Sequence, residues 1–449
     1  MFFIEWQSVA PRVPGPLKTP YIIFPVLCSL LGTFVSVHAD EASPSPLPDP
    51  LSLEAALNLQ SEIHPDVSIK EHALATAKDQ LAYIESDIDL DIRAQLQARY
   101  IEPPEPLRDL GREDHSAKIV ASKTLYDFGR TAYRAESAKQ GVSVAELELE
   151  KILQQRRIDI MQAFFNVIMS DLQYNYDNEA MAIYYIQYDR AKQREELGQL
   201  SEIDVLQRQS EYMEVRRNRY KSEAGQRTSR IRMSEVLDRP AQIVSRFIPP
   251  KLPYSEYKIK DVKQLQEQAL QNNLDLRVLR LQQKQLQQQL QSLRARRMPV
   301  ISASAEAGVY SREIGSNDAW RFGLGVEVPL YQGSRVSKSI AIRTEQLQQL
   351  NLTLYQQELA LKREILSLWL DIDVLLKQKQ SSDTGMDYRE LYLDKARSLY
   401  EMEVKSDLGD SMVALTAAAK YQAETEFEIA LKWERLRFLT QMSLEEMRQ

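Results

Sequence analysis

The chain has 449 residues, of which 27% are charged and 43% hydrophobic, and its formal net charge is −7. A moderately acidic chain is poorly suited to nucleic acid, because phosphate contacts need a basic surface. The single cysteine, Cys28, lies in an apolar run near the N-terminus. The rest of the chain therefore lacks the thiols that disulfides, thiol catalysis and cysteine-ligated metals require.

The N-terminal region has the pattern of an export signal, which we predict over residues 1–39. Arg12 and Lys18 supply positive charge, and an apolar run follows over residues 21–37. An uncleaved membrane anchor is the alternative, but the run is short and contains a proline, which disfavours a membrane span. A proline-rich segment at 40–50 separates the signal from the body of the chain.

Two stretches of alternating polar and apolar residues come next, at 87–100 and 116–126. Side chains of a strand point alternately to its two faces, so each stretch predicts a strand with one apolar and one polar face. The second stretch alternates less regularly than the first. Each is about ten or more residues long, which is the length that a tilted strand needs to cross a bilayer.

A very long helical run follows these strands. Residues 131–197 contain no proline, and apolar residues recur in them at helical spacing. At about 1.5 Å per residue this helix would be about 100 Å long, which exceeds a compact domain and indicates a coiled coil or the wall of a tube. We expect Gly198 to end it in the left-handed conformation, and Ser201 or Asp204 to begin a returning helix.

The same plan then recurs after a linker at 247–260. A helical region rich in leucine and glutamine at 263–297 precedes alternating stretches at 300–310 and 320–331, which predict two further strands. A second long helical run follows and is expected to turn back within residues 403–411. Aromatic residues gather at one end of the predicted strands, as in an interfacial girdle. These residues are Tyr100, Tyr310, Trp320 and Phe322.

The second strand of each pair ends in a similar motif. Leu125-Tyr-Asp-Phe-Gly-Arg130 closes the first pair, and Leu330-Tyr-Gln-Gly-Ser-Arg335 closes the second. Repetition of a whole plan indicates a duplicated structural unit. We therefore predict one repeat over residues 51–246 and another over 261–449.

Soluble sheets that pack on a core are the commoner source of alternating strands. Here the long helices are committed elsewhere, so we predict that the apolar strand faces meet lipid. Four strands are too few to close a membrane barrel, since single-chain barrels start at about eight. Three copies are the simplest solution. The predicted fold is therefore mainly α with membrane β strands: a trimeric twelve-stranded barrel that continues into a long α-helical coiled-coil tunnel.

With these motifs the chain resembles the TolC-type outer-membrane efflux protein family over essentially its whole mature length. The segments 125–129 and 329–333 are similar to the family's strand-to-helix junctions, and residues 198–206 are similar to its Gly-x5-Asp-Val turn. The junction residues are Leu125, Tyr126, Gly129, Pro329, Leu330, Tyr331 and Gly333. The resemblance implies a passive channel from periplasm to exterior, in the outer membrane of a Gram-negative bacterium, that serves tripartite efflux or type I secretion.

The resemblance also implies partners and a gate. The partners are two further copies of the chain, outer-membrane lipid, a periplasmic membrane-fusion adaptor and an inner-membrane pump. By position, the adaptor would dock on Gly198, Gln199, Leu200, Ser201 and residues 405–410. A lock is implied at the closed end, in which Asp204 matches the family's aspartate, Tyr400 its tyrosine and Lys405 its cation.

The chain departs from the family pattern at the second turn. Glu403 stands where the family has glycine, and Met412 and Leu415 fall where carboxylates ring the constriction of the best-known member. Asp407 and Asp410, one turn earlier, are the candidate replacements. Acids in three copies at a narrow end would favour cations and repel anions.

Two other classes of protein were weighed. An enzyme is disfavoured because His64, His72 and His115 are too scattered for a metal site or a catalytic triad, and no phosphate loop or nucleophile elbow is present. We expect no catalytic residue, cofactor or metal. A periplasmic coiled-coil scaffold or adaptor without a pore is the second alternative. Its sheets would not have bilayer-length strands with an aromatic rim.

Overall fold

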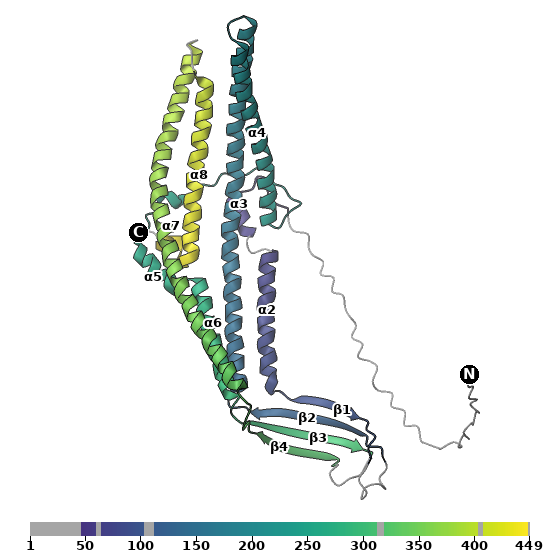
Figure 1. Cartoon of the computed structure of the whole chain (residues 1–449). Helices are drawn as coiled ribbons and strands as arrows, with labels where there is room; N and C mark the ends of the chain where they lie inside the picture. Colours follow the sequence, from purple (N-terminus) through teal and green to yellow (C-terminus); the bar gives the residue numbers. More distant parts are fainter. Residues whose placement is uncertain (1–45, 60–63, 103–111, 312–317, 403–406, 448–449) are drawn as a thin grey trace, which may run out of the picture. The chain divides into compact units, whose positions relative to one another are not determined.

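The computed structural model describes residues 46–59, 64–102, 112–311, 318–402 and 407–447. The predicted signal at 1–39 lies outside these residues, as does Lys405. Leu47–Gln449 forms one compact unit, and it consists of long helices and one four-stranded sheet (Figure 1). The predicted combination of long helices with a small antiparallel sheet is confirmed.

The sheet has the strand order β1-β2-β3-β4, and every neighbouring pair is antiparallel. Its strands are β1 Asp91–Gln97, β2 Ser116–Tyr126, β3 Val300–Tyr310 and β4 Trp320–Glu327. The prediction was too long at β1 and β4. Ser86–Ile88 instead forms a 3₁₀ turn, η2, and β4 stops before Pro329, which has no N–H to donate to a strand partner.

The register of the sheet brings the apolar residues of all four strands to one face. Directly opposed residues of antiparallel strands share a face, and Ile92, Ala121, Ala305 and Phe322 are opposed in turn across the sheet. Side chains more than 60% exposed on this face are Ile92, Leu96, Val309, Trp320, Phe322, Leu324 and Val326. The rest of the described chain therefore leaves the apolar face uncovered.

The helices differ greatly in length. The long ones are α2 Pro65–Glu85, α3 Arg130–Glu196, α4 Glu202–Val236, α6 Leu274–Ala295, α7 Arg335–Glu401 and α8 Leu408–Thr440. The short ones are α1 Leu53–Asn58, η4 Pro253–Glu256, α5 Val262–Asn272 and α9 Leu444–Met447. Helices α3 and α7 each have 67 residues, which corresponds to about 100 Å.

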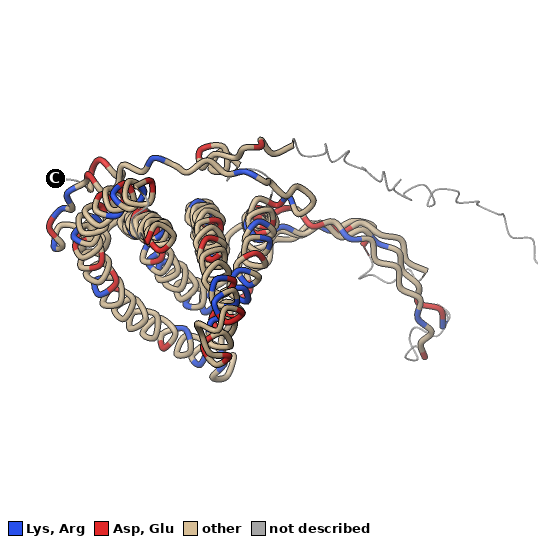
Figure 2. Tube along the Cα trace, turned by 90° about the horizontal axis from the view of Figure 1, so that it is seen from above, with Lys and Arg blue, Asp and Glu red and all other residues tan. Residues whose placement is uncertain are grey.

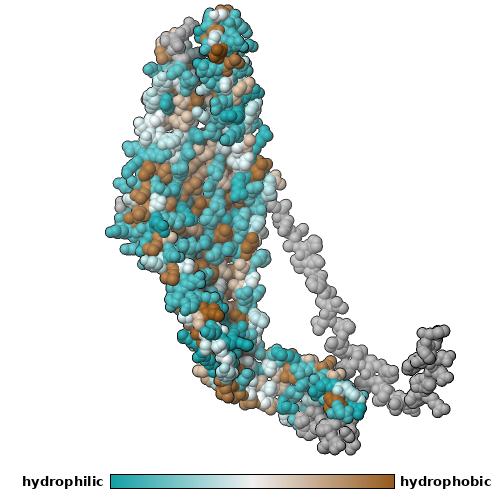
Figure 3. Space-filling model, viewed as in Figure 1, coloured by the Kyte–Doolittle hydropathy of each residue, from teal (hydrophilic) through white to brown (hydrophobic). Residues whose placement is uncertain are grey.

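The long helices pack side by side in rows. The helices α4, α3, α8 and α7 contact one another in that order, so that α4 and α7 are the outer members of the row (Figure 1). In the part nearer the sheet, the corresponding order is α2, α3, α6 and α7. Basic and acidic residues are interspersed along these helices (Figure 2), and hydrophilic residues cover most of the helical surface in view (Figure 3).

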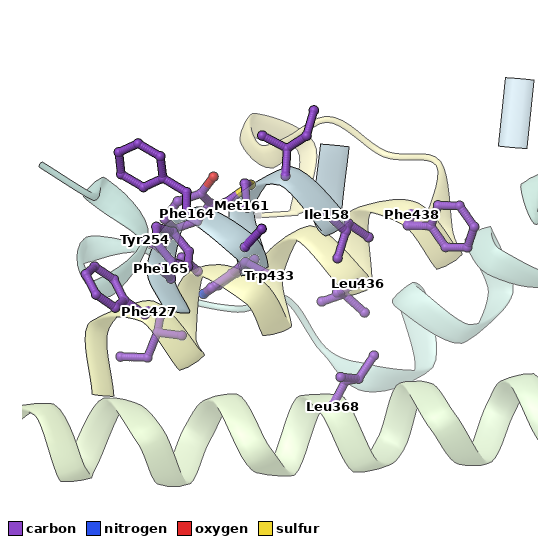
Figure 4. Close-up of a cluster of buried hydrophobic side chains, with 14 of the residues drawn as sticks. Ile158, Met161, Phe164, Phe165, Tyr254, Leu368, Phe427, Trp433, Leu436 and Phe438 are labelled. Atoms are coloured by element: carbon purple, nitrogen blue, oxygen red, sulfur yellow. The ribbon is translucent and has the colours of Figure 1, made fainter. Parts of the chain in front are cut away.

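The main hydrophobic core lies where α3, α7 and α8 meet the segment around η4. Trp433, Phe164 and Phe165 are almost fully buried there, and Phe165 stacks on Phe427 with ring centroids 4.3 Å apart (Figure 4). Aromatic side chains bury large apolar areas. This cluster therefore holds together helices from both halves of the sequence.

Candidate functional site

The turn between α3 and α4 is closed by its own backbone. Gly198 has φ +73°, the left-handed conformation expected from the sequence. Its N–H donates to the carbonyl of Glu195 at 2.7 Å, and the N–H of Gln199 donates to that of Arg194 at 2.8 Å. These two bonds form a Schellman motif. The first helical tip is therefore a short, well-defined turn.

Asp204 forms a capping box with Ser201 at the start of α4. The Asp204 carboxylate accepts hydrogen bonds from the Ser201 hydroxyl at 2.7 Å and the Ser201 N–H at 3.2 Å, and the Asp204 N–H donates to the Ser201 hydroxyl at 3.3 Å. The hydroxyl hydrogen bond holds the pKa of Asp204 below its ordinary value. Asp204 is therefore the ionised carboxylate of the capping box, in which Ser201 is the N-cap. Its part in a lock stays a prediction.

The second tip has a different arrangement. Tyr392 donates a hydrogen bond to the Asp407 carboxylate at 2.8 Å, and this bond raises the pKa of Tyr392. Tyr400, the tyrosine predicted for the lock, is exposed. Glu403 and Lys405 lie outside the described residues. Sequence reasoning missed Tyr392 for two reasons. Tyr400 matched the tyrosine of the family pattern, and the partner of Tyr392, Asp407, lies 15 residues further along the chain.

The start of α8 packs tightly on α3. A Cβ at Gly409 would overlap the side chain of Ile183, and Thr416 donates a hydrogen bond to Glu179. A groove of about 460 Å³ runs beside this contact. Its acidic lining residues are Asp177, Glu211, Glu214 and Asp410. The predicted site residue Asp410 thus lies in an acidic groove of α3, α4 and α8, whose field favours cations.

A buried ionic cluster crosses the core. The carboxylate of Glu434, on α8, is fully buried and accepts two hydrogen bonds from Arg157 of α3, at 3.1 and 3.3 Å. Arg437 donates to it at 2.7 Å and Tyr254 of η4 at 2.8 Å. Burial raises the pKa of Glu434, but the hydrogen bonds and charge of Arg157, together with Arg437, outweigh burial and hold it below its usual value.

The same burial, with the negative charge of Glu434 beside it, raises the pKa of Tyr254. Tyr254 therefore stays protonated and donates its hydroxyl proton to the carboxylate. The cluster joins α3, η4 and α8 at one point. Sequence reasoning missed it, because Arg157 and Glu434 are 277 residues apart and each occupies an ordinary helical position.

The predicted junction residues lie where strands lead into the long helices, and Leu125 and Tyr126 are the last two residues of β2. Gly129 has φ +83° and is the N-cap of α3, while Gly333 has φ +62° close to the start of α7. At the first junction Asp127 accepts hydrogen bonds from the N–H groups of Gly129 at 3.1 Å and Thr131 at 2.7 Å. The rest of the set also borders the strand ends: Leu125, Tyr126, Pro329, Leu330 and Tyr331.

The structure divides the predicted aromatic girdle. Trp320 and Phe322 lie on the apolar face of the sheet. Tyr310 is opposed to Ser116 and lies on the polar face, where its hydroxyl donates to Glu306 at 2.9 Å. Tyr310 thus lies on the face that alternation along β3 gives it, and its part in a girdle stays a prediction. Tyr100 lies beyond β1, in an isolated bridge with Glu113.

In the part of the chain that the structure describes, no three histidine, cysteine or acidic side chains are grouped so that they could hold a metal ion. None of the helices in the described part of the chain is both long enough and apolar enough to span a membrane.

Residues 265–440 match the family model described as outer membrane efflux protein. Over this part the chain is similar to outer membrane efflux proteins. The resemblance predicted from the sequence is thereby confirmed. The family consists of channel proteins, which agrees with the expectation that the chain is not an enzyme. None of the curated proteins matches the chain.

Solved structures of outer-membrane channels have the same fold. The CmeC channel of Campylobacter jejuni is 13% identical, with a TM-score of 0.71 over 86% of this chain and 85% of CmeC. VceC of Vibrio cholerae is 14% identical, with a TM-score of 0.66 over 86% and 94%. The open state of MtrE from Neisseria gonorrhoeae is 12% identical, with a TM-score of 0.66 over 86% and 88%. At these identities the likeness concerns the fold.

Proposed function

We propose that the protein is the outer-membrane channel of a tripartite efflux or type I secretion system, and that three copies form a twelve-stranded barrel continued by a helical tunnel. The observation that carries this proposal is the uncovered apolar face of the sheet. Register aligns the apolar residues of four strands there, and their side chains are exposed. A lipid environment removes such a face from water without any protein partner.

The edges of the sheet support closure by further copies. The order β1-β2-β3-β4 leaves one edge each of β1 and β4 unpaired among the described strands. Unpaired backbone groups are costly inside a bilayer, and a closed barrel removes both edges. In the proposed trimer, β1 of one copy pairs with β4 of the next. Three copies of four strands give the predicted twelve.

The polar face of the sheet would then line the pore. Lys118 and Glu306 form an ion pair at 3.4 Å on this face. Gly323 and Gly325 are opposed to Ser304 and Ser302, so small residues occupy the face between β3 and β4. Small and charged residues suit a water-filled lumen. Passage through such a conduit is passive, and the helical tips supply the gate.

At the tips we assign the lock to Asp204, Tyr400 and Lys405, with Asp407 and Asp410 as the acids of the second turn. The tip Gly198–Ser201 is the proposed docking point for the periplasmic adaptor, which recruits an inner-membrane pump. The support for these roles is the family resemblance and the exposure of the first tip, where Leu197 is 72% exposed. Exposed apolar residues at a tip favour contact with a partner.

The duplicated plan is part of the same proposal. Helices α3 and α7 have equal lengths of 67 residues, and a strand pair and a left-handed glycine precede each of them. This agreement supports repeats at 51–246 and 261–449, joined by the linker 247–260.

Planar-bilayer conductance of the purified protein tests the proposed function. We expect trimers that insert and conduct, with a small conductance in the closed state. The alternative, a periplasmic coiled-coil scaffold without a pore, predicts recovery in the soluble periplasmic fraction and no conductance. That result would remove the channel proposal.

A further inference from the structure

The apolar face of the sheet carries a charge. Register decides which residues share this face: Lys123 of β2 is opposed to Ala303 of β3, and Ala303 is opposed to Leu324 of β4. Among the described strand residues that register places on the apolar face, Lys123 is the only charged one. Its side chain is exposed and makes no ion pair or hydrogen bond within the described chain. A charge that faces lipid calls for a counter-charge, here from outside the chain.

Lys123 lies near the end of the apolar face from which the chain enters the long helices. Only the opposed pair Ile301 and Val326 separates it from the start of β3, which is two residues, or about 7 Å along a strand. In the proposed channel this end of the sheet faces the periplasm. A lysine stem can lie along an apolar surface while its ammonium extends to the polar region beyond it. The ammonium of Lys123 is therefore within reach of the lipid phosphates of the periplasmic leaflet.

A pocket of about 300 Å³ lies next to this lysine, where α2 and α3 meet the sheet (Figure 1). Its lining includes Thr124, Leu125 and Tyr126, the three residues that follow Lys123. The register shifts between Thr124 and Tyr126, so that Leu125 is an extra residue without a partner on β3. Tyr126 is opposed to Ile301 and thus lies on the apolar side of the sheet. The pocket and Lys123 therefore adjoin the same lipid-facing surface.

The pocket combines exposed apolar side chains with acids. Ile88, Leu125 and Tyr126 line it and are 44%, 52% and 55% exposed. Its acids are Asp127, which already accepts hydrogen bonds from two N–H groups at the start of α3, and Glu85, the last residue of α2. The Glu85 side chain is exposed and has no hydrogen bond or ion pair within the described chain. An unpaired carboxylate thus lines the pocket, and an unpaired ammonium adjoins it.

These charges select a ligand that carries both signs. A purely anionic headgroup would suit Lys123 but meet the carboxylate of Glu85, and a simple amine would suit Glu85 but not Lys123. A phosphate joined to a primary ammonium by a short linker satisfies both, because the phosphate accepts from lysine and the ammonium donates to the carboxylate. Acyl chains attached to the phosphate would cover the apolar face. Phosphatidylethanolamine has this constitution.

We propose that the pocket binds the headgroup of one phosphatidylethanolamine of the periplasmic leaflet in each copy, with its phosphate on Lys123 and its ammonium on Glu85. The walls come from α2, η2, β2 and α3 of a single chain, so the site is complete in each copy. Leu324 lies at the level of Lys123 but does not line the pocket, so a charge introduced there has no such partner. The proposal rests on the proposed channel and adds a lipid ligand that holds the sheet at a fixed depth.

Native mass spectrometry tests the ligand. The purified protein is freed of lipid in dodecyl maltoside and incubated with phosphatidylethanolamine or phosphatidylglycerol that have the same acyl chains. We expect phosphatidylethanolamine to be retained, at one molecule per copy, several-fold more than phosphatidylglycerol. Glycerophosphoethanolamine has the headgroup without acyl chains and is expected not to displace the lipid at equal concentration. Displacement would make the ligand a soluble phosphate ester and overturn the proposed lipid.

Substitutions test the two charges separately. Lys123→Gln and Glu85→Gln are each expected to lower the retention of phosphatidylethanolamine several-fold. Glu85→Lys places a second cation at the pocket and is expected to reverse the preference, so that phosphatidylglycerol is retained more. Lys118→Gln, on the polar face of the same strand, and Glu71→Gln, at an exposed position of α2, are the matched controls and leave retention unchanged.

The outcomes separate this site from the channel itself. Equal retention of the two lipids by the native protein and all variants, or equal losses in the controls, overturns the lipid site. Trimers that still insert and conduct in planar bilayers then leave the channel proposal intact. A chain that neither enters membranes nor conducts overturns both.

Discussion

Replacement of Glu434 by glutamine probes the cluster that joins α3, η4 and α8. Glu434→Gln keeps the size of the side chain but removes a charge that Arg157 and Arg437 contact at 2.7 to 3.3 Å. Removing one partner of a buried ion pair costs about 3–5 kcal/mol. Both arginines are about 30% exposed and keep some contact with water, so we expect a lower loss, of about 2–3 kcal/mol. Urea unfolding of the purified protein, followed by helical circular dichroism, measures it.

The pH dependence of this loss has a definite sign. The folded-state pKa of Glu434 is below its ordinary value of 4.5. Its contribution to stability is therefore fully present above pH 4.5 and disappears as the pH falls through the lowered folded-state pKa. The difference between the native protein and Glu434→Gln is expected to be constant near neutral pH and to shrink in acid.

Glu428→Gln is the matched control, because Glu428 lies on the same helix and is exposed. Surface substitutions of this kind stay within about 0.5 kcal/mol. If the two variants unfold at the same urea concentration, or if the loss in Glu434→Gln persists unchanged in acid, the buried ionic cluster does not stabilise the fold as reasoned.

Three further predictions concern the tips and the sheet. Gly198→Ala forces a Cβ into a left-handed backbone and is expected to cost about 1–2 kcal/mol, measurable by the same urea unfolding; no change would mean that the turn relaxes. Asp204→Ala is expected to enlarge the single-channel conductance, whereas Ser201→Ala, which breaks the same capping box but keeps the carboxylate, leaves it small; equal conductances would remove Asp204 from the lock. Leu324→Lys places a charge on the apolar face and is expected to cost about 2–4 kcal/mol in the bilayer, seen as loss from the outer-membrane fraction. Ser304→Lys, on the polar face, is retained there, and equal loss of both would contradict the assignment of faces.

The strands were predictable because alternation is a local signal. Residues 301–309 of β3 follow the period of two, and β2 and β3 have the bounds that were predicted from the alternation. The ends of β1 and β4 were not predictable from alternation alone. At the start of the first stretch, Asp87 and Ile88 follow the alternating pattern but belong to η2. At the end of the fourth stretch, Pro329 has no N–H to donate to a strand partner.

Much of the candidate site depends on contacts that no local pattern encodes. Glycine is the residue that most readily adopts the left-handed conformation found at Gly198, so the turn at the first tip could be predicted from the sequence. The Glu434 cluster and the contact of Gly409 with Ile183 join residues far apart in sequence, and periodicity indicates which side of a helix is buried but not what covers it. Tyr392 illustrates the same limit, since Tyr400 fits the family pattern while Tyr392 makes the hydrogen bond.

The two tips therefore differ in what holds them, although the helices leading to them have equal lengths. The first is closed by backbone bonds around Gly198 and by the capping box of Asp204. The second is tied by a side-chain bond from Tyr392 to Asp407 and by the packing of Gly409 on α3. Helix α8 is also held to α3 through the ion pair of Glu434 with Arg157. In the proposed gate, opening at the second turn breaks side-chain interactions such as the bond from Tyr392 to Asp407. The first turn keeps its backbone bonds and its capping box.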